Sequence, residues 1–253
     1  MAEDVLVSRP GTRVLPTVSF GPYGLLEAVP WLMFAAAMRF LGYSNAAFAL
    51  PALILSSLAL FLAFLLAARR MIEFADGTTQ LGKFSFHDQL LIARNILRQV
   101  VVLLVAGTIV VALAGFPKYA ILMLAGFDGI AFDQFTKPGM LWSATLAAVV
   151  LLMVVGAGDG AAVSLRAALA QLAARWRYLV PAILLVAALQ TVLSGGQGIV
   201  RGLVREFFRT DAPMQIKNIV YFAFVFGFAT LRLWTTLAVL VFALRESYRR
   251  ATP

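Results

Sequence analysis

Long runs of apolar residues, separated by short polar segments, make up most of the chain. A helix needs about 20 mostly apolar residues to cross a hydrocarbon core about 30 Å thick. Six runs meet or approach this length, and they give the predicted spans 25–43, 46–68, 99–115, 140–157, 178–193 and 219–244. The runs are continuous, without the alternation of apolar and polar residues that is typical of membrane-spanning strands. The pattern therefore predicts an all-α, polytopic transmembrane bundle of about six spanning helices.

The composition agrees with a membrane protein, since 62% of the residues are hydrophobic and only 13% are charged. A soluble domain carries about 25% charged residues, so lipid is the expected solvent for much of this surface. The chain has no cysteine and a single histidine, His87, which excludes disulfides and thiol chemistry and argues against a histidine metal site. We interpret the net charge of +9 as basic loops that face anionic lipid headgroups. No cofactor and no nucleic-acid partner are expected.

The distribution of Lys and Arg between alternate loops predicts the orientation in the membrane. The side that holds both termini carries 13 of these residues, and the opposite side carries 7. Cytoplasmic loops are the more basic ones, so both termini are predicted to be cytoplasmic. The fifth loop is unusually basic for an outside loop and argues against this orientation. The Ala, Leu, Val and Arg usage is typical of GC-rich bacteria, and we place the protein in a bacterial inner membrane.

The predicted organisation is a cytoplasmic segment 1–24 without a cleavable signal pattern, a six-span domain 25–244 and a cytoplasmic tail 245–253. Within the domain, residues 84–98, 161–177 and 198–209 have the amphipathic pattern of helices that lie in the membrane interface. The first two each open on a serine and lead into a span. We favour convergence over two related halves as the reason for that similarity.

Arginines on these interfacial helices are the predicted contacts for lipid headgroups or partner proteins. The third helix carries one every four residues, which places them on one face. The predicted contact residues are Arg98, Arg175, Arg177, Arg201, Arg205 and Arg209.

Arg232 is the most informative single residue because it lies near the middle of the sixth predicted span. A charge at that depth costs about 2.5–3.5 kcal/mol on insertion scales, so the side chain is expected to face protein or water. It would either contact an anion or lipid headgroup in a cavity or pair with groups on other helices. The candidate partners are Asp159, Asp128 and Glu27. For Asp128 to serve, the loop 116–138 must enter the membrane as a re-entrant segment, and the alternative is an interfacial one.

Catalytic signals are weak. The sequence contains no phosphate-binding glycine loop, zinc helix motif or serine nucleophile elbow. The sequence leaves three hypotheses. The first is a non-enzymatic structural, assembly or accessory subunit that contacts lipids and other membrane proteins, and the alternative is a small transporter or channel for an anion or lipid, with Arg232 in the pathway. The third and weakest is a lipid-modifying enzyme that uses Asp159 or His87.

Overall fold

The computed structural model describes residues 27–44, 46–76, 86–132, 136–158 and 163–251 of the chain. These residues form helices joined by short turns, and no strand occurs among them, which confirms the all-α prediction. The α-helices are α1 (Val29–Ser44), α2 (Ala49–Asp76), α3 (Phe86–Leu113), α4 (Pro117–Leu124), α5 (Lys137–Gly158), α6 (Leu165–Ala174), α7 (Trp176–Phe208) and α8 (Met214–Ala251). Two short 3₁₀ helices, η2 (Ala46–Phe48) and η4 (Asp128–Ile130), lie between them.

Five of the described helices, α2, α3, α5, α7 and α8, are long and apolar enough to span a membrane. The protein is therefore a multi-pass membrane protein, as the hydropathy pattern predicted. The first predicted span corresponds to α1, which has 16 residues in the described part of the chain. At a rise of about 1.5 Å per residue, α1 is about 24 Å long and falls short of the usual spanning length. It packs against α2 as a hairpin, and Gly42 permits the close approach, because a Cβ there would lie 3.2 Å from the Cβ of Ala52.

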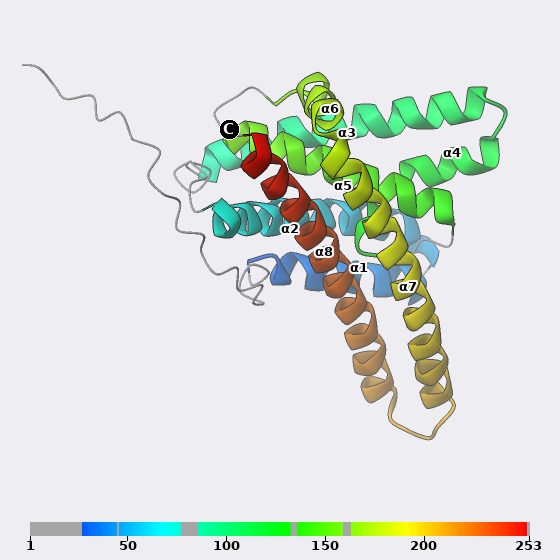
Figure 1. The fold of residues 1–253 in the computed structure, drawn as a ribbon. Coiled ribbons are helices and arrows are strands. Elements are labelled where there is room, and N and C mark those ends of the chain that lie inside the picture. The colour runs from blue at the N-terminus through cyan, green and yellow to red at the C-terminus, as the bar shows by residue number, and fades with distance from the viewer. Residues whose placement is uncertain (1–26, 45, 77–85, 133–135, 159–162, 252–253) are drawn as a thin grey trace, which may run out of the picture.

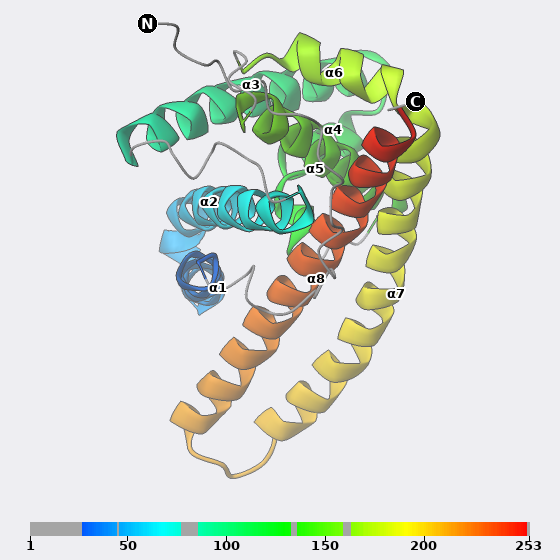
Figure 2. The ribbon, with the colours of Figure 1, turned by 60° about the vertical axis from the view of Figure 1, so that its left-hand side comes forward.

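Helices α7 and α8 form a long hairpin that runs obliquely to the other helices (Figures 1 and 2). The loop that joins them projects well away from α3, α5 and α6. Helix α5 lies at the centre, with 72% of its spanning window buried, whereas only 11% of the window of α3 is buried. The reason lies in the sequence of α5, which is apolar around its whole circumference and so can be covered on every side.

The predicted interfacial helices differ in how they join the spans. Residues 86–98 form the first half of α3, without a break before the span. The second is a separate short helix, α6, and Ser164 caps it by accepting a hydrogen bond from the backbone N–H of Ala167 at 3.4 Å. The serine that opens the first, Ser85, lies outside the described residues.

The third interfacial helix was placed wrongly in a loop, because residues 198–208 simply continue α7. No proline interrupts this segment, so the helix of the fifth span extends until Phe208. The connection to α8 is therefore short, and α8 also continues past residue 244 to Ala251. The tail that was predicted to start at residue 245 is largely helical.

The segment between α3 and α5 enters the bundle and returns to the end from which it came (Figure 1). Helix α5 holds it by two side chains: Trp142 Nε1 donates to the carbonyl of Met123 at 3.0 Å, and Ser143 Oγ donates to the carbonyl of Gly126 at 2.6 Å. The ring of Phe127 then packs against Phe61 of α2, with the centroids 5.6 Å apart. Residues 117–132 therefore pack inside the bundle, as the re-entrant alternative requires, and their depth in the membrane stays a prediction. We call residues 117–132 the re-entrant segment.

Candidate functional site

A cavity of about 840 Å³ lies between the α1–α2 hairpin, the re-entrant segment and the α7–α8 hairpin. Helices from both halves of the chain and the re-entrant segment contribute to its wall. The polar lining consists of Arg39, Tyr43, Asp128, Thr136, Gln197, Arg201, Arg205 and Tyr221. The apolar lining consists of Leu53, Ala125, Phe132, Val204, Phe208, Phe224 and Val225. A wall of both kinds suits a ligand that is itself partly charged and partly apolar.

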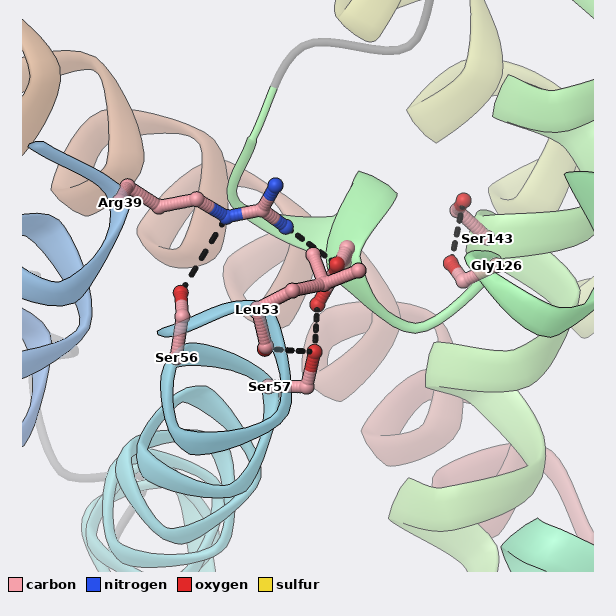
Figure 3. Close-up of polar contacts among 7 residues, drawn as sticks. Arg39, Leu53, Ser56, Ser57, Gly126 and Ser143 are labelled. Atoms are coloured by element: carbon pink, nitrogen blue, oxygen red, sulfur yellow. Dashed lines mark hydrogen bonds and ion pairs between the residues drawn. The ribbon is translucent and has the colours of Figure 1, made fainter. Parts of the chain in front are cut away.

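One side of the cavity is built around an ion pair between Arg39 of α1 and Asp128 of η4 (Figure 3). Arg39 Nε also donates to Ser56 Oγ at 3.2 Å, and its guanidinium lies 4.6 Å from the ring centroid of Phe132. Ser57 Oγ lies 2.6 Å from the second carboxylate oxygen, Oδ1, of Asp128. The Asp128 residue is only 7% exposed, so the re-entrant segment carries a carboxylate into the bundle and delivers it to a matching cation. These contacts attach the segment to α1 and α2.

The opposite side is a row of nitrogen donors on α7. Gln197, Arg201 and Arg205 are four residues apart, which places them on one helix face. That face is turned to the cavity, and Arg201 and Arg205 share it, as their four-residue spacing predicted. Arg209 does not belong to the lining: it is exposed and pairs with Glu206 at 2.8 Å.

The charge of the described lining is unbalanced, with three guanidinium groups against a single carboxylate. Asp128 pairs with Arg39 and neutralises that one cation. The other two guanidinium groups of the lining belong to Arg201 and Arg205 on α7, beside the phenol of Tyr221 and the amide of Gln197. An anion is therefore the kind of ligand that this cavity favours electrostatically.

Behind the α7 wall lies Arg232, which is completely buried. Its Nη1 donates to Gln190 Oε1 at 2.9 Å, and its Nη2 donates to Ser194 Oγ and Gln197 Oε1, each at 2.8 Å. The Gln190 amide nitrogen donates onward to Thr236 Oγ1 at 2.9 Å. It also lies 3.5 Å from the carbonyl oxygen of Ile130 in the re-entrant segment. Arg232 is thus the centre of a buried network that joins α7, α8 and the re-entrant segment.

Two of the three candidate partners of Arg232 pair with other arginines, and the third lies outside the described residues. Asp128 pairs with Arg39, and Glu27 pairs with Arg70 of α2, so both carboxylates serve other arginines. The hydrogen bond from Arg70 holds the pKa of Glu27 below its ordinary value. Asp159 lies outside the described residues, and its pairing with Arg232 stays a prediction.

The partners named for Arg232 from the sequence were all carboxylates, so its neutral acceptors on α7 were not among them. Gln190, Ser194 and Gln197 are spaced by four and three residues in an apolar helix, which is the spacing of one polar face. That spacing was visible in the sequence. A buried arginine can be satisfied by amide and hydroxyl oxygens as well as by a carboxylate.

None of the other predicted contact residues lines the cavity. Arg98 is exposed on α3, and Arg177 is exposed at the start of α7 near the ring of Trp176. Arg175 is half-buried and stacks on Tyr248, with 3.9 Å from its guanidinium carbon to the ring centroid. His87 belongs to α3, and nothing is described of its side chain. The described residues contain no cluster of three or more metal-ligating side chains.

Comparison with protein-family models, curated proteins and solved structures gives no match to this chain. The function must therefore be inferred from the cavity and its surroundings alone.

Proposed function

We propose that this multi-pass membrane protein binds an anionic amphiphile, namely an anionic lipid of the surrounding membrane, in the cavity between its two helix hairpins. The observation that carries the proposal is the excess of guanidinium groups in a wall that is otherwise largely apolar. A volume of 840 Å³ lies within the usual range for small-molecule pockets, about 300–1,000 Å³. It would accommodate a headgroup and the first part of its acyl chains. The apolar lining, including Phe208 and Phe224, is suited to those chains.

This proposal develops the predicted alternative of an anion or lipid handler, with one change of residues. Arg232 is fully buried and does not line the cavity, so we assign direct contact with the ligand to Arg201, Arg205 and Gln197 instead. A protein that binds an anionic lipid needs both a cation for the headgroup and an apolar surface for the chains. Both are present in this wall.

The accessory-subunit role stays a second proposal, supported by α3. Its spanning window is the least buried of the five, and large apolar side chains such as Val102, Ile109 and Val110 are exposed on it. Another membrane protein could pack there in place of lipid. Recovery of a stoichiometric partner with the chain in mild detergent, and its loss on substitution of Val110 by Trp, would support that role.

A test of lipid binding compares two arginines at the C-terminal end of α7, Arg205 and Arg209. In uncharged detergent, dioctanoyl-phosphatidylglycerol should raise the melting temperature, since a ligand that binds only the folded state stabilises it. Dioctanoyl-phosphatidylcholine should raise it less, and inorganic phosphate should have no effect. Arg205→Gln should weaken phosphatidylglycerol binding about fivefold, the equivalent of about 1 kcal/mol for one basic residue near an anionic headgroup.

Arg209→Gln is the matched control, because Arg209 directly follows the same helix as its C-cap but lies outside the cavity lining. It should bind the lipid like the wild type. Equal weakening in both variants would show only a general attraction of the basic helix end to anionic lipid. No difference between the two lipids in the wild type would contradict the proposal itself.

We further propose that the membrane is a bacterial inner membrane and that both termini are cytoplasmic, which requires α1 to cross the membrane beside α2 as a sixth span. This orientation places the α7–α8 loop on the periplasmic side. The chain has no cysteine, so single cysteines report without background. A membrane-impermeant maleimide added to spheroplasts should label Asp211→Cys in that loop and should not label Arg250→Cys. Labelling of Arg250→Cys alone would reverse the orientation.

A further inference from the structure

The amide of Gln197 is oriented by a residue that lies behind the cavity wall. An arginine side chain can only donate hydrogen bonds, so the group of Gln197 that faces Arg232 must be its oxygen. The amide nitrogen is therefore directed away from Arg232. Gln197 is only 7% exposed and lines the cavity, yet within the part of the chain that the structure describes its Nε2 has no hydrogen-bond partner. Because Gln197 lines the cavity, this nitrogen is available there to an acceptor on a ligand.

The acceptor that fits is a group with several oxygens. Gln197, Arg201 and Arg205 form a donor row about 12 Å long on α7, given a rise of about 1.5 Å per residue. Gln197 is the inner end of the row and Arg205 lies near the end of the helix. Arg39 faces the row from α1. Donors that converge from two helices match the tetrahedral oxygens of a phosphoryl group better than the two coplanar oxygens of a carboxylate.

We infer that Gln197 and Arg201 form a phosphoryl subsite in this cavity and that buried Arg232 is the positioning residue that holds the Gln197 amide in its donating orientation. The inference rests on the proposed lipid binding and adds which part of the lipid is recognised and by which atoms. The phosphoryl group accepts from Gln197 Nε2 at the inner end. Arg205 lies at the mouth, and Val204, Phe208 and Val225 contact the chains.

Arg232 has this role because a glutamine amide is otherwise free to reverse. With its oxygen turned to the cavity, Gln197 would repel an oxyanion instead of donating to it. The Nη2 of Arg232 shares its two hydrogens between Ser194 and Gln197, and this fixes the side chains of both. Arg232 contacts no ligand itself, since it is fully buried.

The test uses Gln197→Glu and, as its matched control, Gln190→Glu. Each variant places a carboxylate against Arg232 in place of an amide oxygen and changes the net charge equally. Only position 197 lines the cavity. We expect Gln197→Glu to keep the melting temperature of the wild type, because its carboxylate still accepts from Arg232. It should bind dioctanoyl-phosphatidylglycerol at least about tenfold more weakly, the equivalent of one lost charge-assisted hydrogen bond.

Gln190→Glu should lose less than about threefold in affinity, which corresponds to the through-space effect of one buried charge. Equal losses in the two variants, or none in Gln197→Glu, would overturn the inference while leaving lipid binding by the wild type in place. Failure of the wild type to bind the lipid would instead overturn the proposed function.

The headgroup class is tested with the same proteins. The wild type should prefer dioctanoyl-phosphatidic acid to decanoate, a carboxylate amphiphile, and Gln197→Glu should lose that preference. Binding of inorganic phosphate alone, as tight as that of the lipid, would show that the subsite serves a free anion. An equal affinity of the wild type for the phosphoryl and carboxylate amphiphiles would refute the phosphoryl assignment.

Discussion

Replacement of Arg232 by alanine is expected to lower the free energy of unfolding by about 3 kcal/mol. The substitution removes a large, fully buried side chain and three hydrogen bonds to α7. It leaves a void and three oxygens without their donor in the middle of the protein. Relief from burying a charge offsets part of the loss but not the packing defect. In a chain of this size the melting temperature in mild detergent should fall by about 10 °C.

Arg209→Ala is the control for this substitution. Arg209 is exposed, and its ion pair with Glu206 lies at the surface, where such pairs contribute about 0–1 kcal/mol. The melting temperature of Arg209→Ala should stay within about a degree or two of that of the wild type. The melting temperature of Arg232→Lys should lie between those of Arg232→Ala and Arg209→Ala. The ammonium of a lysine keeps the charge, but it cannot reach acceptors in two directions as a guanidinium does. Unchanged stability of Arg232→Ala would contradict a structural role for the buried network.

Replacement of Gly126 by alanine should have the second largest effect, about 1–3 kcal/mol of unfolding free energy. A Cβ at this position would lie 2.3 Å from Cδ1 and 2.4 Å from Nε1 of Trp142, and 2.8 Å from a methyl of Leu146. Such contacts are too short, so the indole or the re-entrant segment must move. Either shift breaks the hydrogen bond from Trp142 to Met123.

The same shift should disturb the cavity. Asp128 is two residues beyond Gly126, and its carboxylate holds Arg39 in place. Gly126→Ala is therefore expected to weaken phosphatidylglycerol binding as well as stability, and thermal unfolding with and without the lipid measures both. Gly227→Ala on α8 is the matched control, since nothing lies within 4 Å of the added Cβ. A helical glycine replaced by alanine gains up to about 1 kcal/mol, so that variant should be as stable as the wild type or slightly more stable.

The helices and their approximate positions followed from the sequence because hydropathy and helix period are local properties. Five of the six predicted spans are present as long apolar helices, and the first predicted span corresponds to the shorter helix α1. The ends were less predictable. The glycine-rich run at residues 194–198 has the composition of a helix end, yet α7 continues through it to Phe208, so the predicted basic loop became the outer part of α7. The need of Arg232 for buried partners also followed from its position in the sixth span.

The identity of partners did not follow, because it depends on which helices pack together. Asp128 and Arg39 are 89 residues apart, and no local pattern links them. Gln190, Ser194 and Gln197 looked like ordinary polar residues until α8 placed a guanidinium against them. Neutral groups of this kind have no charge that would mark them as partners in advance.

The sequence by itself determined that this is a multi-pass helical membrane protein with one arginine at mid-span and a basic stripe beyond the fifth predicted span. Both properties follow from the composition of the chain and the spacing of its apolar and basic residues. Only the tertiary structure decided that the segment after α3 packs against α2 and α5, that the stripe faces a cavity, and that Arg232 lies behind the wall of that cavity. These features arise from side chains distant in sequence that burial forces to satisfy one another, and no window of the sequence contains both partners.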